Sequence, residues 1–266
     1  MNTTNQKFQK DQKKDQTGRI TCHPLCEPLF KDTDEKYARF DSRLLPDVDP
    51  ERIAGIRVPV IREYAAELRK DRSDPEIEEF LSDLPHGFLE EDMLHALLLN
   101  IESDERKLLG QLEVFLQNAE GNWKMCDALN PKIFRKALKN PEFEHDFRDR
   151  MNDWIDSEHL YQARFAIRMF MVHYLKERYD KRQLIRIGLI QRPEYYFEMM
   201  QGWYLAEAAI SHFDDVVDLL QSEELSEAVF RKAVSKSLDS FRISENHKEQ
   251  LRKLREFKKR QSQLGK

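Results

Sequence analysis

Apolar residues recur along most of this chain with the period of an α-helix. The pattern is clearest over residues 89–101 and 229–241, where the apolar side chains share one helical face. These positions are Leu89, Met93, Leu94, Leu97, Leu98 and Ile101, and Val229, Phe230, Ala233, Val234, Leu238 and Phe241. No stretch alternates apolar and polar residues with the period of two that a half-buried strand shows. The pattern therefore predicts an all-α protein.

Proline marks the beginning of several of these helices, because the first helical turn does not need the N–H that proline lacks. Such starts occur at Asp49-Pro50, Asp74-Pro75, Asn130-Pro131, Asn140-Pro141 and Arg192-Pro193. Together with the periodic pattern they predict helices over residues 34–44, 50–70, 74–83, 89–102, 104–119, 122–129, 131–139, 142–155, 158–178, 181–190, 194–212, 214–221, 226–241 and 244–261.

Pairs of these predicted helices recur about every 35–45 residues, which is the size of a HEAT-type helical hairpin. The spacing predicts HEAT-like helical repeats that form a curved α-α superhelix, or solenoid. Such a solenoid has a concave surface that suits a long convex ligand such as a nucleic-acid duplex. A compact helical bundle is the structural alternative.

Composition fits one extended helical core. The 266 residues include only 8 Gly and 10 Pro, while 40% are apolar and 35% are charged. We predict a single helical-repeat domain over residues 29–266, preceded by a polar, flexible tail over residues 1–28.

Cys22-His23 and Cys26 superficially suggest half of a metal site. No second pair of ligands accompanies them, so we predict no metal site there.

The compartment follows from the cysteines and from the apolar runs. Three cysteines leave one unpaired in any disulfide scheme, which favours a reducing compartment. No segment approaches the ~18 apolar residues of a membrane-spanning helix, and no secretory leader pattern begins the sequence. We therefore expect a soluble, cytoplasmic protein without a membrane partner.

The net charge of −5 argues mildly against a nucleic-acid partner, but the positive charges are unevenly distributed. They concentrate in residues 132–139, 176–192 and 248–260, whereas acidic residues dominate 72–92 and 214–227. One positive face on an acidic body would produce this distribution. A solvated helix exterior would produce it equally well.

Trp123 and Asp127 are the most informative pair in the sequence. Their spacing of four places an indole and a carboxylate one turn apart on one helical face. Such a pair suits a cationic or electron-poor partner. A half-buried tryptophan beside a solvated carboxylate is the alternative interpretation.

Several segments together resemble the DNA alkylation repair family, the AlkD-like DNA glycosylases built of HEAT-like repeats. The resemblance covers about residues 30–257 and depends on five elements in the family's order. The first element is Gly55-Ile56-Arg57-Val58-Pro59-Val60-Ile61-Arg62, preceded by Lys36-Tyr37-Ala38-Arg39-Phe40 and Leu45-Pro46. The second is His86 with Glu90-Glu91, and the third is Asn122-Trp123-Lys124-Met125-Cys126-Asp127. The fourth is Arg164-Phe165-Ala166-Ile167, and the fifth is Gln201-Gly202-Trp203.

The resemblance implies a DNA repair glycosylase that hydrolyses the N-glycosidic bond of cationic N3- or N7-alkylated purines, such as 3-methyladenine and 7-methylguanine. It implies Asp127 as the catalytic residue, and Trp123, Arg164 and Trp203 as residues that contact the damaged DNA. The partner would be duplex DNA with alkylated bases. We expect a monomer without a cofactor, cytoplasmic and associated with the nucleoid when bound to DNA.

Other interpretations remain open at the level of sequence. The chain could be a non-catalytic relative that binds duplex or branched DNA by shape, or a solenoid scaffold for protein partners. Arg164 could be an ordinary solvated or ion-paired residue and Trp203 a core residue. Trp154 is expected in the core, and His86 with Glu90 and Glu91 is expected to begin a helix rather than bind a metal. If the solenoid is correct, the four candidate site residues should converge in its concave groove.

Overall fold

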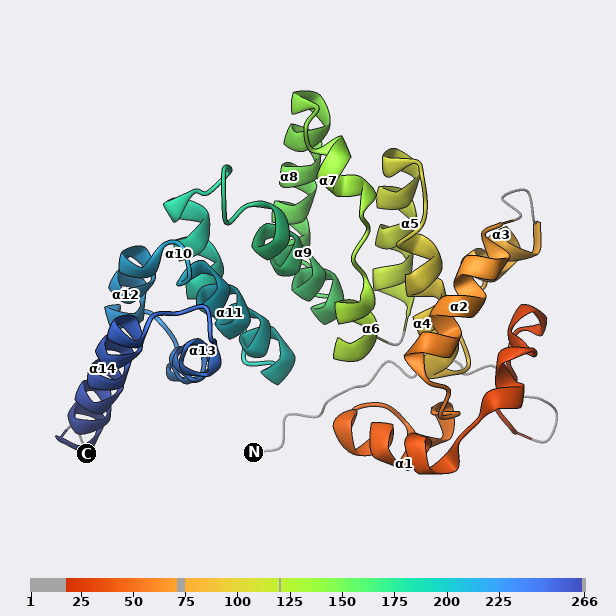
Figure 1. The fold of residues 1–266 in the computed structure, drawn as a ribbon, viewed down its shortest axis with the longest axis horizontal. Helices are drawn as coiled ribbons and strands as arrows, with labels where there is room; N and C mark the ends of the chain where they lie inside the picture. Colours follow the sequence, from red (N-terminus) through yellow and green to blue (C-terminus); the bar gives the residue numbers. More distant parts are fainter. Residues whose placement is uncertain (1–17, 71–74, 120, 265–266) are drawn as a thin grey trace. The chain divides into compact units, whose positions relative to one another are not determined.

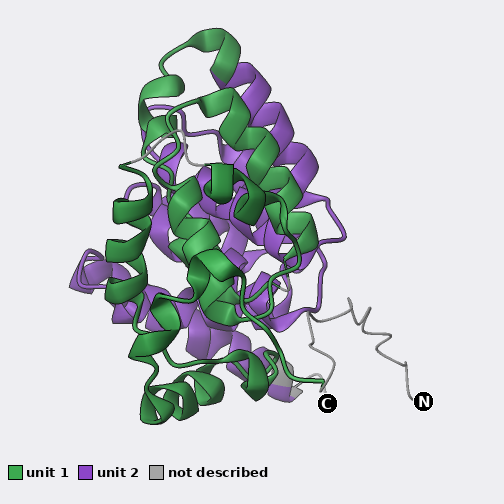
Figure 2. Cartoon of the chain, turned by 90° about the vertical axis from the view of Figure 1, so that its right-hand side faces the viewer, with its two compact units in different colours: residues 1–143 green, residues 144–266 purple. Residues whose placement is uncertain are grey.

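The structure, a computed structural model, describes residues 18–70, 75–119 and 121–264, and every regular element in these ranges is helical (Figure 1). The prediction of an all-α protein is thereby confirmed. Two compact units follow each other along the chain, residues 1–143 and residues 144–266 (Figure 2). Each unit is described by itself.

The first unit begins with short elements and continues with longer helices. Its 3-10 helices are η1 (Pro24–Cys26), η2 (Leu29–Asp32) and η3 (Pro50–Arg52). Its α-helices are α1 (Glu35–Leu44), α2 (Val58–Leu68), α3 (Pro75–Ser82), α4 (Leu89–Leu99), α5 (Glu105–Asn118), α6 (Trp123–Ala128) and α7 (Ile133–Ala137). Helices α2, α4 and α6 pack side by side as one layer, and α5 packs on both α4 and α7.

The second unit repeats this plan. It contains most of α8 (Pro141–Ile155), followed by α9 (Leu160–His173), α10 (Lys181–Leu189), α11 (Tyr195–Ala208), α12 (Phe213–Gln221), α13 (Glu227–Asp239) and α14 (Glu245–Leu264). Helix α11 lies between α9 and α13, while α12 contacts α10 and α14. Each unit thus places every second helix in the same layer. The candidate site residues all belong to the α2–α4–α6 layer or the α9–α11–α13 layer.

Helix α4 forms the centre of the first unit, because all of its residues are buried. Its charged residues are satisfied by specific partners. Asp92 Oδ2 pairs with Arg52 Nη2 at 3.1 Å, and both side chains are buried. Arg52 also donates to the backbone carbonyls of Gly87 at 2.8 Å and His86 at 3.1 Å. This contact ties η3 to the start of α4.

The predicted helix over residues 50–70 is interrupted in the structure. Only η3 and α2 are helical, and the backbone between them turns at Gly55, whose φ is +86°. A Cβ atom at Gly55 would lie 2.3 Å from the carbonyl oxygen of Asp34, so no other residue fits without a shift. The carboxylate of Glu90 accepts from the N–H groups of Ala54, Gly55 and Ile56 at 2.8–3.2 Å. A long-range contact therefore overrides the local helical pattern.

The predicted tail over residues 1–28 lies partly within the described residues. Residues 1–17 lie outside the described residues. Residues 18–28 include η1, in which Leu25 and Cys26 are buried, and the N–H of His23 donates to Glu91 Oε1 at 2.6 Å. The sequence pattern gave no indication of this burial, because so short a segment shows no helical period.

Candidate functional site

Helix α6 carries Trp123 and Asp127, and it forms because both of its ends are capped by asparagines. Asn122 Oδ1 accepts from the N–H of Met125 at 2.8 Å and so caps the first turn. At the other end Asn100 Nδ2 donates to the carbonyl of Ala128 at 2.8 Å. Met125 and Cys126 are fully buried and fix which face of this short helix points into the core.

Trp123 and Asp127 lie one turn apart on the part of α6 that stays partly exposed. The indole Nε1 of Trp123 donates to the carbonyl of Leu44, the last residue of α1, at 3.1 Å. This bond holds one edge of the ring, and it joins α6 to a helix that lies 79 residues earlier in the chain. The pair consists of an oriented aromatic ring beside a carboxylate.

Lys124 provides a second contact between α6 and α1. Its Nζ pairs with the carboxylate of Asp41, whose side chain is 3% exposed, and also approaches the hydroxyl of Tyr37 at 3.4 Å. The same ammonium group lies 5.3 Å from the centre of the Tyr37 ring. Lys124 is thus directed toward α1 and takes part in positioning α6.

Arg164 lies on α9 in the second unit and is buried, with 4% of its surface exposed. Its Nη1 donates to the carbonyl of Tyr196 at 2.8 Å, near the start of α11. The alternative of an ordinary solvated arginine therefore does not describe this residue. Burial and the bond to Tyr196 hold the guanidinium in one orientation.

Trp203 is partly exposed on α11, directly after a glycine that controls helix packing. A Cβ atom at Gly202 would lie 2.6 Å from the Cβ atom of Lys232 on α13. The glycine thus permits the close approach of α11 and α13. Lys236 of α13 lies with its Nζ 5.9 Å from the Trp203 ring. Trp154, by contrast, is 4% exposed, as its core prediction requires.

Three tyrosines, Tyr161, Tyr195 and Tyr196, lie close together where Arg164 bonds to the carbonyl of Tyr196, and the sequence argument missed them. The rings of Tyr161 and Tyr196 lie 6.4 Å apart, and those of Tyr195 and Tyr196 lie 5.2 Å apart. Tyr195 is 60% exposed, and the Nζ of Lys232 lies 5.0 Å from its ring. The spacing of Tyr195 and Trp203, eight residues on one helix, is the signal that could have revealed this aromatic surface.

His86 and the two glutamates after it have separate tasks. Glu91 begins α4 as predicted, since its Oε2 accepts from the N–H of Phe88 at 2.8 Å. Glu90 instead holds the Gly55 loop, and burial raises the pKa of its carboxyl above the usual value, although backbone N–H groups partly oppose this effect. His86 Nε2 lies 2.9 Å from Nδ1 of His95, and both histidines are buried.

No group of three or more His, Cys, Asp or Glu side chains suited to a metal ion occurs in the described part of the chain. Cys22, Cys26 and Cys126 are not joined in disulfides in the described part of the chain. Likewise, none of the described helices is both long and apolar enough to cross a lipid bilayer.

Trp123 and Asp127 belong to the first unit, and Arg164 and Trp203 to the second. Their predicted convergence in one groove therefore stays a prediction, as do their roles. In a comparison with protein families, residues 30–237 match the family described as DNA alkylation repair enzyme. A search of the curated proteins finds no match.

Proposed function

The chain belongs to the DNA alkylation repair enzyme family, and from this premise we propose that it is a DNA glycosylase for cationic alkylpurines. Its substrates would be N3- and N7-alkylated purines in duplex DNA, such as 3-methyladenine and 7-methylguanine. Water would replace the damaged base at C1′ of the deoxyribose. The observation that carries the proposal is the pair of Trp123 and Asp127, partly exposed one turn apart on α6 in a chain of this family.

The positive charge of an alkylated base makes that base a good leaving group, so the reaction needs no strong general acid. The difficult species is the oxocarbenium-like sugar that remains. A carboxylate such as Asp127 at ~4 Å from this charge, with an effective dielectric near 20, would stabilise it by about 4 kcal/mol before desolvation costs. This corresponds to a rate gain of about a thousandfold. Asp127 would also orient the attacking water.

The other three residues would hold the damaged strand around Asp127. Trp123 and Trp203 would offer indole faces to the sugar and to its developing positive charge, since tryptophan is the strongest cation–π partner among the side chains. Arg164 would contact a phosphate beside the lesion and so set the register of the strand. The bond from Arg164 to the Tyr196 carbonyl supports this role because it restrains the guanidinium before DNA binds.

We further propose that the two units together form a HEAT-like solenoid, with the duplex in its concave groove and all four residues facing it. Within each unit the alternation of helices between layers supports this arrangement. The protein would act as a cytoplasmic monomer without a cofactor, associated with the nucleoid when bound to DNA.

Release of free base from methylated duplex DNA is the direct test. Wild-type protein should release 7-methylguanine or 3-methyladenine well above the spontaneous rate. Asp127→Asn should lower this rate by orders of magnitude and leave duplex affinity nearly level. Asp153→Asn is the matched control, since Asp153 is an exposed aspartate of α8, and it should retain full activity. No release by a folded wild-type protein would refute the proposal.

The alternative function, shape-dependent binding of duplex or branched DNA without catalysis, gives a different result. Such a protein would bind DNA equally well with aspartate or asparagine at position 127, and neither form would release base.

A further inference from the structure

Helix α14 takes no part in the proposed chemistry. It spans Glu245–Leu264, whereas the family match ends at residue 237. It is the longest helix of the described chain, and residues 252–260 contain six lysines and arginines and a single acid, Glu256. The whole chain, by contrast, has a net charge of −5. Such a concentration of positive charge at one helix requires an explanation.

One face of α14 is fixed on the second unit. The ring of His247 stacks on that of Phe213 of α12, with 3.7 Å between the ring centres, and Leu251 is fully buried. Farther along, Lys258 Nζ donates to the carbonyl of Ser222 at 3.2 Å and lies 5.0 Å from the Phe230 ring of α13. The helix is therefore a rigid part of this unit.

The opposite face of α14 points to solvent and is rich in cations, with Glu256 exposed among them. We define the α14 basic face as Arg252, Lys253, Arg255, Lys259 and Arg260. The Lys253 side chain is 76% exposed and lies 3.9 Å from Glu249. The Arg252 side chain is 41% exposed and pairs with Glu245 and Glu249. From residue 252 to 260 this face extends about 12 Å along the helix axis.

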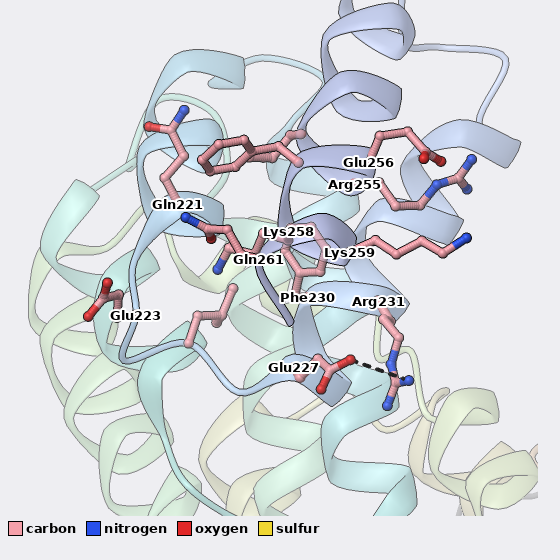
Figure 3. Close-up of a pocket in the computed structure, with 13 residues that line it drawn as sticks. Gln221, Glu223, Glu227, Phe230, Arg231, Arg255, Glu256, Lys258, Lys259 and Gln261 are labelled. Atoms are coloured by element: carbon pink, nitrogen blue, oxygen red, sulfur yellow. Dashed lines mark ion pairs between the residues drawn. The ribbon is translucent and has the colours of Figure 1, made fainter. Parts of the chain in front are cut away.

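A groove of about 1010 Å³ between α14, α13 and the turn before α13 borders this face. Figure 3 shows Arg255 and Lys259 of α14 extending on the same side of the groove as Arg231 of α13, away from Gln221 and Glu223, with Glu256 beside Arg255. Arg231 thus extends the positive surface onto a second helix, although it also pairs with Glu227 at 3.5 Å.

The composition of this surface selects its partner. A membrane-binding helix inserts a broad apolar face, but the apolar side chain of Leu251 is already buried in the protein. Phe257 is the one large apolar side chain exposed on the described part of α14. An array of cations with a single exposed apolar side chain suits instead a regular array of negative charges, and duplex DNA carries one phosphate per ~1.7 Å of its axis.

We propose that the α14 basic face binds the phosphate backbone of duplex DNA independently of damage, as a second contact outside the site of base excision. The proposal rests on the proposed function in taking DNA as the substrate. It adds a surface that raises the affinity for undamaged duplex and keeps the protein on DNA between lesions. Its signature is salt dependence, because each neutralised phosphate releases bound counterions.

The test is the binding of an undamaged duplex at several salt concentrations. The variant combines Lys253→Gln, Arg255→Gln, Lys259→Gln and Arg260→Gln, since glutamine keeps a high helix propensity at exposed positions. The slope of log K against log[salt] should become shallower by about 2 to 4, at ~0.9 per lost phosphate contact. Release of methylated base at saturating protein should stay within twofold, because α14 does not contact the reacting sugar.

A matched control removes the same four charges elsewhere. Lys132, Arg135, Lys136 and Lys139 are exposed in and beside α7, and their replacement by glutamine gives the same net charge. This control should leave the slope unchanged. Arg255→Lys with Arg260→Lys should also leave it unchanged, because counterion release depends on charge. Circular dichroism and thermal unfolding of every variant would establish that α14 remains folded.

Three results would overturn the proposal: an unchanged slope in the α14 variant, an equal change in the α7 control, or unaltered DNA binding together with lost binding to phosphatidylserine vesicles. Failure of the proposed function is separate from these. A wild-type protein that releases no base, but whose DNA binding depends on the α14 basic face, would refute the glycosylase proposal and support this one.

Discussion

The ion pair between Asp41 and Lys124 offers a quantitative test of how the first unit positions the candidate carboxylate. Helix α6 has six residues, so its own backbone hydrogen bonds hold it only weakly. Lys124 ties it to α1 through Asp41 and Tyr37. The side chains of Asp41 and Lys124 are 3% and 16% exposed, so both charges are largely removed from water. We expect Asp41→Asn to loosen α6 and misplace Asp127.

The size of the effect follows from this burial. Two unit charges at ~3 Å, with an effective dielectric near 20, attract by about 5.5 kcal/mol, and desolvation of both groups offsets much of this. Removal of one partner from a buried pair costs ~3–5 kcal/mol because the other charge stays buried and unpaired. Lys124 retains some access to water, which places Asp41→Asn near the lower end, at about 3 kcal/mol. The coupling energy between the two residues should be ~1.5–3 kcal/mol.

A double-mutant cycle measures this coupling. Urea unfolding of wild type, Asp41→Asn, Lys124→Gln and the double variant gives four free energies of unfolding. The control cycle uses Arg106 and Glu142, a pair at 3.3 Å whose side chains are 62% and 77% exposed. Its coupling should stay below ~1 kcal/mol. Equal coupling energies in the two cycles would refute the argument.

The same substitution tests the link to function. A displacement of about 1 Å at a reacting group can lower a rate by about a hundredfold. Asp41→Asn should therefore slow base release at a temperature where the protein stays folded. Arg106→Ala, which removes an exposed pair on α5, should not.

Three further predictions concern a backbone turn, acid stability and the candidate phosphate contact. Gly55→Ala should lower the free energy of unfolding by ~2 kcal/mol or more, because the φ of Gly55 is +86° and a Cβ would collide with backbone. Gly110→Ala, in open space on α5, should be neutral or stabilising. Urea unfolding measures both, and equal effects of the two substitutions would contradict the prediction. Burial lowers the pKa of His95 well below its usual value, so only the unfolded chain protonates this histidine as the pH falls below about 6.5. Below that pH the free energy of unfolding should therefore fall by up to ~1.4 kcal/mol per pH unit. If His95→Gln leaves this dependence on pH unchanged, His95 is not its cause. Arg164→Ala should slow base release and lower the slope of log K against log[salt] by ~1. Arg164→Lys should recover DNA affinity better than the rate of base release, because a point charge lacks the planar fork of the guanidinium. Since Arg164 is buried, unfolding of each variant is measured as well, and equal base release by wild type and both variants would remove Arg164 from the site.

The helical pattern of this sequence alone determined that the protein is all-α and where most of its helices lie. Most of the periodic apolar positions over residues 89–101 and 229–241 lie in α4 and α13, because a helix that packs in a core needs apolar residues at a spacing of three or four. Ile101 and Phe241 lie past the ends of these helices and are 46% and 92% exposed, so the pattern extended both helices too far along the chain. The sequence also supplied the order of motifs that identified the family. Trp123 and Asp127 were found at this level because their relation is local, one turn of one helix.

The tertiary structure decided whatever depends on residues that are far apart in the chain. Glu90 holds the backbone around Gly55 in a turn, 35 residues earlier, where the sequence pattern predicted continuous helix. The Asp41–Lys124 pair spans 83 residues, and the burial of Arg164 depends on α11. Hydrophobic periodicity reports only which face of a helix is covered. The period does not indicate which residues cover that face, so only the packed structure, in which distant residues meet, shows these contacts.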